Sequence, residues 1–154
     1  MKRITCVAGT LLLLVMFCPL AMAKKTVLTA SEVTAFFADH TMTVKDEIPD
    51  KKTGETAEFK AFFSKLGGVR AIGGDGSAEN YNWQVKKDGA FCARNSNRWR
   101  DGICGFVVEE NDTYGLYVNK RGNEKAKTRD DRAIFDSRWK HTLTFSDFQP
   151  GEQL

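Results

Sequence analysis

Short apolar runs alternate with turn signals along the chain from Ala57 onward. The runs are VRAI, YNWQV, AFCAR, ICGFVV, YGLYV and AIF, and the signals between them include Gly67-Gly68, Asp88-Gly89 and Asn111-Asp112. Runs of this length and spacing, without a long helical repeat among them, are typical of antiparallel strands that follow one another along the chain. The pattern predicts a mainly β fold, a small antiparallel β-barrel or meander.

The run YNWQV shows the strand alternation most clearly. Tyr81, Trp83 and Val85 alternate with Asn82 and Gln84. Because successive side chains of a strand point to opposite faces of the sheet, one face of this strand is expected to be apolar and the other polar. AFCAR follows across a short turn signal and is expected to pair with this run as a hairpin.

A different signal, in the stretch LTASEV, predicts one short helix before the strands. Thr29 can accept a hydrogen bond from the backbone N–H of Glu32, and the Glu32 carboxylate can accept one from the N–H of Thr29. Leu28 can also pack on Val33. This combination is a capping box with a hydrophobic staple, so a helix is expected to begin at Ala30.

Beyond this start, Val33, Phe36 and Phe37 fall on one helix face, which must bury against the rest of the domain. The helix is expected to end near Asp39-His40, and the β-branched run TMTV after it predicts a strand. The fold class is therefore α+β, dominated by strands.

Residues 59–66 carry two competing patterns. The i, i+3, i+4, i+7 spacing of a helix is present in Phe59, Phe62, Phe63 and Leu66, with Gly67 as a C-terminal cap. A strand over residues 59–63 would instead let a turn at 66–68 lead into VRAI. We prefer the strand, and the helix remains the alternative.

Three further segments have simpler patterns. Residues 45–56 are charged and contain proline and glycine, which is typical of an exposed loop. Residues 119–132 form a dense cluster of mixed charge and are expected to be a solvated hairpin end or loop. The C-terminal part has enough apolar side chains to dock on the domain, and Pro150-Gly151 predicts a loose tail after it.

Residues 1–23 have the pattern of a secretory signal peptide. A basic head, Met1-Lys2-Arg3, precedes an apolar stretch that ends at Pro19, and the small-residue triplet Ala21-Met22-Ala23 follows. The apolar stretch is short for a bilayer span, which needs roughly 20 apolar residues, so an uncleaved anchor is the lesser alternative. We expect cleavage to leave residues 24–154 as a single periplasmic or secreted β-rich domain without a membrane span.

The charge of the mature chain argues against two classes of partner. The full sequence has a formal net charge of +3, and removal of Lys2 and Arg3 with the signal peptide lowers it to +1. A nearly balanced charge provides little attraction to nucleic acid or to an anionic membrane surface. We therefore expect neither as the main partner, and we expect a monomer that recognises an unknown cell-envelope ligand or protein.

Cysteine usage predicts one disulfide. The other two cysteines leave with residues 1–23, so Cys92 and Cys104 remain as an even pair in an exported chain. A zinc site would need about four ligands, and only His40 and His141 accompany the thiols, at no recognisable spacing. The C-x-x-C motif of redox proteins is absent. We predict a disulfide between Cys92 and Cys104 that joins neighbouring strands, and neither a metal nor a cofactor.

Signals for catalysis are weak. The sequence has no G-x-S-x-G motif around a serine, and no sequence pattern around His40 or His141 indicates an activated nucleophile. The acidic pairs at 109–110 and 130–131 would point to opposite faces of a strand, which separates their carboxylates. No catalytic residue is therefore assigned.

The stretch RNSNRWRDG between the two cysteines is the best candidate for a ligand-binding site. Arg94, Arg98 and Arg100 supply cations and Trp99 an aromatic face, and both residue types are enriched at binding hot spots. A disulfide across the ends of this loop would reduce the entropy that is lost on binding. In the alternative interpretation, Trp99 packs over an open end of the barrel and the arginines stay in water.

Four stretches together resemble a known family. LTASEVTAFF, AFFSKLGGVRAIGGDG, NWQVKKDGAFC and GICGFVVEENDTYGLYV span most of the mature chain. They are similar to a family of small exported bacterial proteins, the domain of unknown function number 995. The shared pattern is an N-terminal helix, an aromatic strand with a glycine turn, a hairpin that ends in Cys92, and Cys104 before a closing aromatic strand. The resemblance implies export and a β-rich domain, and it implies no activity.

These features favour an exported binding module of unknown specificity. Such a module would recognise a cell-envelope ligand or protein through the mouth of the barrel or the loop from Arg94 to Arg100. Inhibition of an enzyme that attacks the cell wall is one form that this function could take. The alternative is a small periplasmic hydrolase with an unrecognised site, which a polar pocket joining His40 or His141 to a carboxylate would favour.

Overall fold

The computed structural model describes residues 25–95, 102–119 and 139–154. The predicted signal peptide, most of the charged segment 119–132 and the run AIF lie outside these ranges, as do the predicted ligand residues Arg98, Trp99 and Arg100. None of the helices formed by the described residues has the length and apolar character needed to cross a membrane.

One helix and nine strands make up the described chain. The helix, α1, is Ala30–Phe37. The strands are β1 Lys25–Val27, β2 His40–Asp46, β3 Glu58–Phe63, β4 Gly68–Gly73, β5 Ala78–Val85, β6 Phe91–Asn95, β7 Gly102–Glu110, β8 Thr113–Asn119 and β9 Trp139–Pro150. The runs TMTV, VRAI, YNWQV, AFCAR, ICGFVV and YGLYV fall on β2 and on β4 to β8, which confirms these strand predictions.

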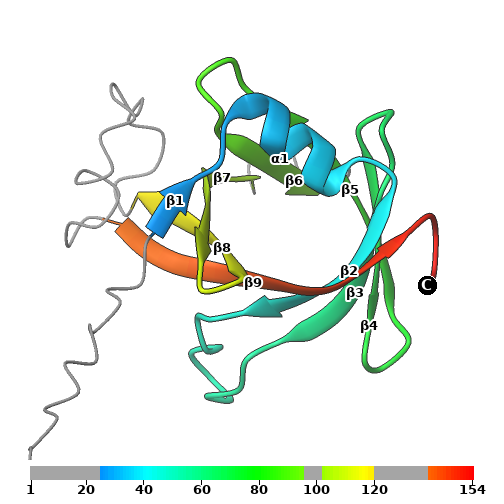
Figure 1. Cartoon of the computed structure of the whole chain (residues 1–154). Coiled ribbons are helices and arrows are strands. Elements are labelled where there is room, and N and C mark those ends of the chain that lie inside the picture. The colour runs from blue at the N-terminus through cyan, green and yellow to red at the C-terminus, as the bar shows by residue number, and fades with distance from the viewer. Residues whose placement is uncertain (1–24, 96–101, 120–138) are drawn as a thin grey trace, which may run out of the picture.

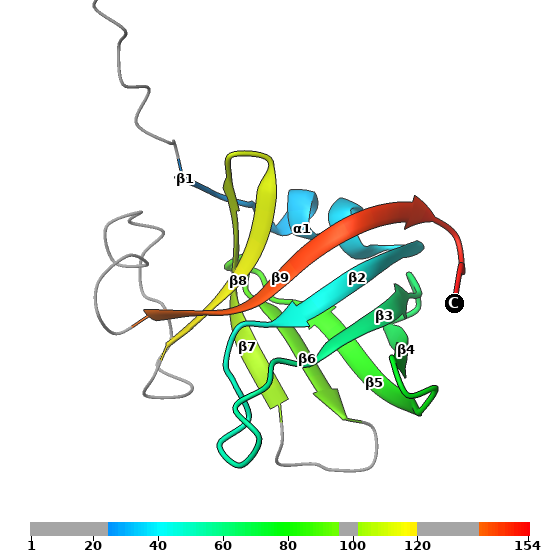
Figure 2. The same cartoon turned by 90° about the horizontal axis from the view of Figure 1, so that it is seen from below.

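Eight of these strands close into an antiparallel barrel. Neighbouring strands follow the order β7-β6-β5-β4-β3-β2-β9-β8, and β8 pairs with β7 to close the ring (Figure 1, Figure 2). β7 has different partners along its length, because residues 102–105 pair with β6 and residues 106–110 pair with β8. β1 adds to the end of β7, with Val27 opposite Val108. The predicted small antiparallel barrel with one short helix is confirmed.

The helix begins as the sequence predicts. The backbone N–H of Glu32 donates to Thr29 Oγ1 at 3.3 Å, and the N–H of Thr29 donates to Glu32 Oε2 at 2.7 Å. α1 ends at Phe37, slightly before the predicted end near Asp39-His40. Asp39 has a left-handed backbone conformation with a φ of 56°, and the chain turns there directly into β2.

Phe37 fills the interior of the barrel. Its side chain is 0% exposed. Its ring centroid lies 4.8 Å from that of Phe63 on β3, 4.3 Å from that of Phe91 on β6 and 5.1 Å from that of Phe145 on β9. Val33 is also fully buried, so the apolar helix face seen in the sequence is the face that packs against the barrel core (Figure 1).

Residues 59–66 form a strand and a turn, which confirms the preferred interpretation. β3 pairs with β2 on one side and with β4 on the other. Ala61 and Phe63 belong to the core, whereas Leu66 lies in the turn after β3 and is 90% exposed. The spacing that suggested a helix therefore comes from strand residues that point inward, strand residues that point outward, and one exposed leucine in the turn.

The C-terminal part forms the longest strand of the described chain. β9 runs for 12 residues and pairs with both β2 and β8, so the apolar residues in this part dock as a strand of the barrel.

The sequence predicts a loose tail after this strand. Thr41 Oγ1 donates to the carbonyl of Gly151 at 2.7 Å and accepts from the N–H of Gln153 at 2.9 Å. Glu152 also pairs with Arg70 at 3.1 Å, so residues 151–153 contact β2 and β4.

Gly105 lies where the backbones of β7 and β8 approach closely. A Cβ atom built on Gly105 would overlap the backbone carbonyl of Tyr117 and would lie 3.0 Å from Cγ2 of Val118. A backbone carbonyl cannot rotate away as the end of a flexible side chain can, so glycine is needed here. The approach lies where β7 exchanges β6 for β8 as its partner, which makes Gly105 important for closure of the barrel.

Phe37→Ala should lower the free energy of unfolding by about 3–5 kcal/mol, the cost of removing a large aromatic side chain from a packed core. Urea denaturation followed by tryptophan fluorescence measures this change, since Trp83 lies 5.9 Å from Phe37 between ring centroids. The control is Leu66→Ala, which removes an exposed apolar side chain and should change the free energy by less than about 0.5 kcal/mol. Equal losses in the two variants would contradict a central role for Phe37.

Gly105→Ala should destabilise the protein by about 1–3 kcal/mol, the usual range for forcing atoms into filled space. Gly68→Ala is the matched control, because Gly68 begins another strand of the barrel and no heavy atom lies within 4 Å of its built Cβ. Thermal unfolding of both variants gives the comparison. A Gly105→Ala protein as stable as the control would show that β7 and β8 approach less closely than described.

Candidate functional site

The disulfide joins directly opposed residues of β6 and β7. Cys92 and Cys104 are register partners, and their Cα atoms lie 4.1 Å apart. The bridge spans a sequence separation of 12, and closure of so short a loop corresponds to about 3 kcal/mol of stabilisation in the chain-entropy model. The predicted disulfide is confirmed as a link across one hairpin.

A polar groove surrounds this bridge on the outer face of the barrel, and we call it the β5–β7 groove. Its volume is about 250 Å³. The residues that matter for recognition are Asn82, Gln84, Lys86, Arg94, Gly102 and the disulfide. They come from three consecutive strands and from the residue that follows β5.

The strand register explains why a groove forms here. Asn82, Arg94 and Gly102 lie in one row across β5, β6 and β7, and Gln84, Cys92 and Cys104 lie in the next row along. These rows face away from the core, because Trp83 in the row between them belongs to the core, and its row partners Ala93 and Ile103 pack against it. Gly102 has no side chain and the disulfide is compact, so the space between the longer side chains stays open.

The groove is cationic and rich in hydrogen-bonding groups. Arg94 and Lys86 contribute positive charges, and Asn82 and Gln84 contribute amides that both donate and accept hydrogen bonds. Trp83 also borders the groove, but it is only 8% exposed, and its Nε1–H donates to a backbone carbonyl in the β3–β4 turn at 2.8 Å. Side chains of β5 and β6 and of the residue after β5 therefore supply the recognition groups.

The structure places one of the predicted ligand residues in this groove. Arg94 lies on its wall, whereas Arg98, Trp99 and Arg100 lie outside the described residues. Sequence reasoning missed Asn82, Gln84 and Lys86. The alternation in YNWQV indicated a polar face, and the expected pairing of this run with AFCAR could have placed Arg94 beside that face.

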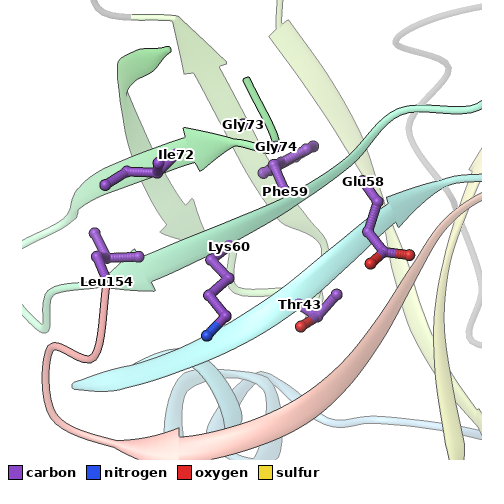
Figure 3. Close-up of a pocket in the computed structure, with 8 residues that line it drawn as sticks. All are labelled: Thr43, Glu58, Phe59, Lys60, Ile72, Gly73, Gly74 and Leu154. Atoms are coloured by element: carbon purple, nitrogen blue, oxygen red, sulfur yellow. The ribbon is translucent and has the colours of Figure 1, made fainter. Parts of the chain in front are cut away.

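A second groove, the β2–β4 groove, lies on the outer face of other strands (Figure 3). Its volume is about 280 Å³, and its walls include Thr43, Glu58, Lys60, Ile72 and Leu154. Lys60 and Glu58 carry opposite charges, so no single charge dominates among the lining residues. Leu154 is the last residue of the sequence, and it follows the tail residues that contact β2 and β4. The chain's own tail therefore forms part of this groove.

The two histidines take separate positions. His40 begins β2, and its Nδ1 lies 2.9 Å from the carbonyl of Ala38. His141 lies on β9, with Nε2 3.0 Å from a backbone carbonyl of that strand and 3.2 Å from Thr144 Oγ1. Thr144 Oγ1 donates to Glu47 Oε1 at 2.7 Å. A hydroxyl thus links His141 to a carboxylate.

The direction of these hydrogen bonds does not suit nucleophilic catalysis. A carbonyl oxygen only accepts, so Nε2 of His141 carries the proton in its hydrogen bond to the β9 carbonyl. The hydroxyl proton of Thr144 is directed at Glu47. His141 Nε2 therefore cannot take the proton of Thr144, as the general base beside a nucleophile must.

His141 is also closely packed. The ring of Tyr117 stacks on the imidazole, with centroids 5.0 Å apart and planes 9° apart. A Cβ atom on Gly115 would come within 2.5 Å of His141 Nε2, so the glycine leaves the room that the imidazole occupies. These contacts hold the imidazole of His141 in place beside a pocket of about 280 Å³ that Glu110 also lines.

The pKa of Glu47 is lowered from its ordinary value. The main cause is the hydrogen bond that Thr144 donates to the carboxylate, and the positive charge of Lys45, whose Nζ lies 3.6 Å from Glu47 Oε1, adds to it. Partial burial acts in the opposite direction and is outweighed. Glu47 is thus held as a carboxylate at the end of the hydrogen-bond chain.

Neither metal-binding side chains among the described residues nor comparisons with known proteins indicate another site. In the part of the chain that the structure describes, no three His, Cys, Asp or Glu side chains are grouped so that they could hold a metal ion. No family model matches the chain, and comparison with curated proteins and solved structures finds no significant match. The resemblance to the domain of unknown function number 995 stays a prediction.

Thr144→Val should raise the pKa of Glu47 toward its ordinary value, because the hydroxyl that stabilises the carboxylate is lost. A lowered pKa in the folded state adds stability above the unfolded-state pKa, and this stability is lost as the pH falls through the folded-state pKa. The variant should therefore lose less stability on acidification than the wild type does. NMR titration of the side-chain carboxyl carbons measures the pKa directly.

The control for this experiment is Thr43→Val, which removes a β2 hydroxyl with no described hydrogen bond to Glu47. It should leave the titration of Glu47 as it is in the wild type. An unchanged Glu47 pKa in Thr144→Val would refute the hydrogen bond as the main cause of the shift.

Proposed function

We propose that this chain is an exported, non-catalytic binding module that takes its ligand in the β5–β7 groove. The observation that carries the proposal is the convergence of Arg94, Lys86, Asn82 and Gln84 around a disulfide-linked hairpin. Concave sites with a few well-placed polar groups are the usual places where small ligands bind.

The scaffold of the groove supports this role. β5 and β6 each have hydrogen-bonded neighbours on both sides, and the disulfide holds β6 against β7. Side chains presented by such strands need little ordering when a ligand arrives, which lowers the entropic cost of binding.

Export is the second part of the proposal. Disulfides persist in oxidising compartments and are rare in the cytosol, so the bridge between Cys92 and Cys104 favours a location outside the cytoplasm. The signal-peptide pattern of residues 1–23 points the same way and favours the periplasm or secretion. A ligand or partner in the cell envelope follows from this location.

The hydrolase alternative has weaker support. The only histidine linked to a carboxylate among the described residues is His141, and the link runs through a hydroxyl whose proton is directed away from the imidazole. A binding role uses the groups of the β5–β7 groove without any such proton transfer.

A cell-envelope extract should contain a component that shifts the NMR signals of the groove. The measurement is a set of ¹H–¹⁵N spectra of the oxidised protein with fractions of the extract, and the expected shifts fall on residues 82–86, 92–94 and 102–104. The double variant Arg94→Ala, Gln84→Ala should weaken binding by about tenfold or more, since it removes one charged and one neutral hydrogen-bonding group.

The matched control is the double variant Thr43→Ala, Lys60→Ala, which removes one charged and one neutral group from the β2–β4 groove. This variant should bind as the wild type does. Shifts confined to the β2–β4 groove, or binding that survives the loss of Arg94 and Gln84, would count against the proposal.

A further inference from the structure

We infer that the β5–β7 groove takes a sugar that bears a carboxylate, of the uronic acid type. This inference rests on the proposed function and adds the chemical class of the ligand. Four features of the groove support it: its charge, its amides, the pairing of its strands and its size.

The charge of the groove selects an anion. Among the described residues that line the groove, Arg94 and Lys86 are cationic and none is Asp or Glu. The planar guanidinium of an arginine matches a planar carboxylate with two parallel hydrogen bonds, whereas a lysine acts as a point charge. Arg94 is therefore the residue expected to contact the carboxylate.

The amides select hydroxyl groups beside that anion. Asn82 lies opposite Arg94 in the register, and Gln84 lies two residues farther along the same face of β5. Each amide offers donors and an acceptor, and each sugar hydroxyl also donates and accepts, so both partners are satisfied. Inorganic phosphate near neutral pH keeps only one or two O–H groups on a single centre, so it satisfies the amide oxygens of Asn82 and Gln84 less fully than a sugar ring with several hydroxyls.

The strand pairing argues against an extended acidic peptide. Such peptides commonly add a strand to an open sheet edge through main-chain hydrogen bonds. β5 already pairs with β4 and β6, and β6 already pairs with β5 and β7. A ligand in the groove must therefore be recognised by side chains alone, which suits a sugar better than a peptide main chain.

The size of the groove fits a small ligand. Its volume of about 250 Å³ lies just below the roughly 300–1,000 Å³ typical of pockets for drug-sized molecules. Both cysteines of the disulfide line the groove, and Cys92 is 7% exposed. A compact sulfur surface can pack against the C–H face of a sugar ring while the ring substituents reach Arg94 and the amides.

Isothermal titration calorimetry of the oxidised protein with trigalacturonic acid tests the inference. Three probes each remove one element of the ligand: the methyl ester of trigalacturonic acid lacks the charge, inorganic phosphate lacks the sugar hydroxyls, and triglutamate offers carboxylates on a peptide. Each should bind about tenfold more weakly than the acid, or not at all, since each loses hydrogen bonds to charged or amide groups.

Variants assign the binding to the groove. Arg94→Gln should weaken the binding of trigalacturonic acid about tenfold. Gln84→Ala should weaken this binding less. Lys60→Gln, which removes a charge from the β2–β4 groove, should leave it unchanged. Bound trigalacturonic acid should also slow reduction of the Cys92–Cys104 bridge by dithiothreitol, because the ligand covers the sulfur atoms.

Four outcomes would overturn the inference. Equal binding of the methyl ester would show that the protein does not recognise the carboxylate. Equal binding of phosphate or triglutamate would show that it does not recognise the sugar. If one of these probes binds as tightly as the acid and Arg94→Gln weakens its binding, the inference fails but the proposed function stands. Absence of binding by trigalacturonic acid, or binding unaffected by Arg94→Gln, also overturns the inference, and the screen with envelope extract then decides the proposed function separately.

Discussion

Phe37 reaches from the helix into the ring of strands, where its side chain contacts aromatic rings from β3, β6 and β9. The interior of an eight-stranded barrel is just wide enough to be filled by side chains. Small residues face the same core, because Ala61 and Ala71 lie opposite each other on β3 and β4. The helix thus contributes a large side chain that the strands have room to accept, and the core holds the helix and the barrel together.

The packing of the core also determines which side chains the barrel presents on its outer face. Along each strand, inward and outward side chains alternate, so the residues that pack the core also fix the positions of their outward neighbours. Trp83 and Phe91 are core residues, and their neighbours Gln84 and Cys92 consequently lie side by side on the β5–β7 groove. The groove therefore depends on the packing on the other side of the same strands.

Local signals in the sequence predicted most elements of the fold. The capping box around Thr29 and Glu32, the alternation in YNWQV and the turn pairs all act between residues close in sequence, so they can be recognised without the structure. The disulfide followed from the even cysteine count. The helix instead ends early because Ala38 takes an extended conformation and Asp39 a left-handed one, which no simple pattern specifies.

Features that depend on register were harder to predict. The row of Asn82, Arg94 and Gly102 exists only because three strands pair with one particular alignment. The link from Glu47 through Thr144 to His141 joins residues far apart in the sequence, and no local pattern marks it. Composition suggested the arginine-rich stretch as a site, and of its four predicted ligand residues only Arg94 lies within the described ranges.

The position of β9 has a consequence for how the chain folds. β9 is the last strand in the sequence, yet it lies between β2 and β8, with His40 opposite Pro150. Hairpins such as β3–β4 and β5–β6 join neighbouring segments and can form early, whereas the seam between β2 and β9 needs contacts between residues that are 97 to 110 positions apart in the sequence. Such long-range pairing is slow because the entropy of closing the loop is lost before the contacts form. Until β9 docks, β2 and β8 each present an open edge, so the chain is prone to pair with other chains before the barrel closes.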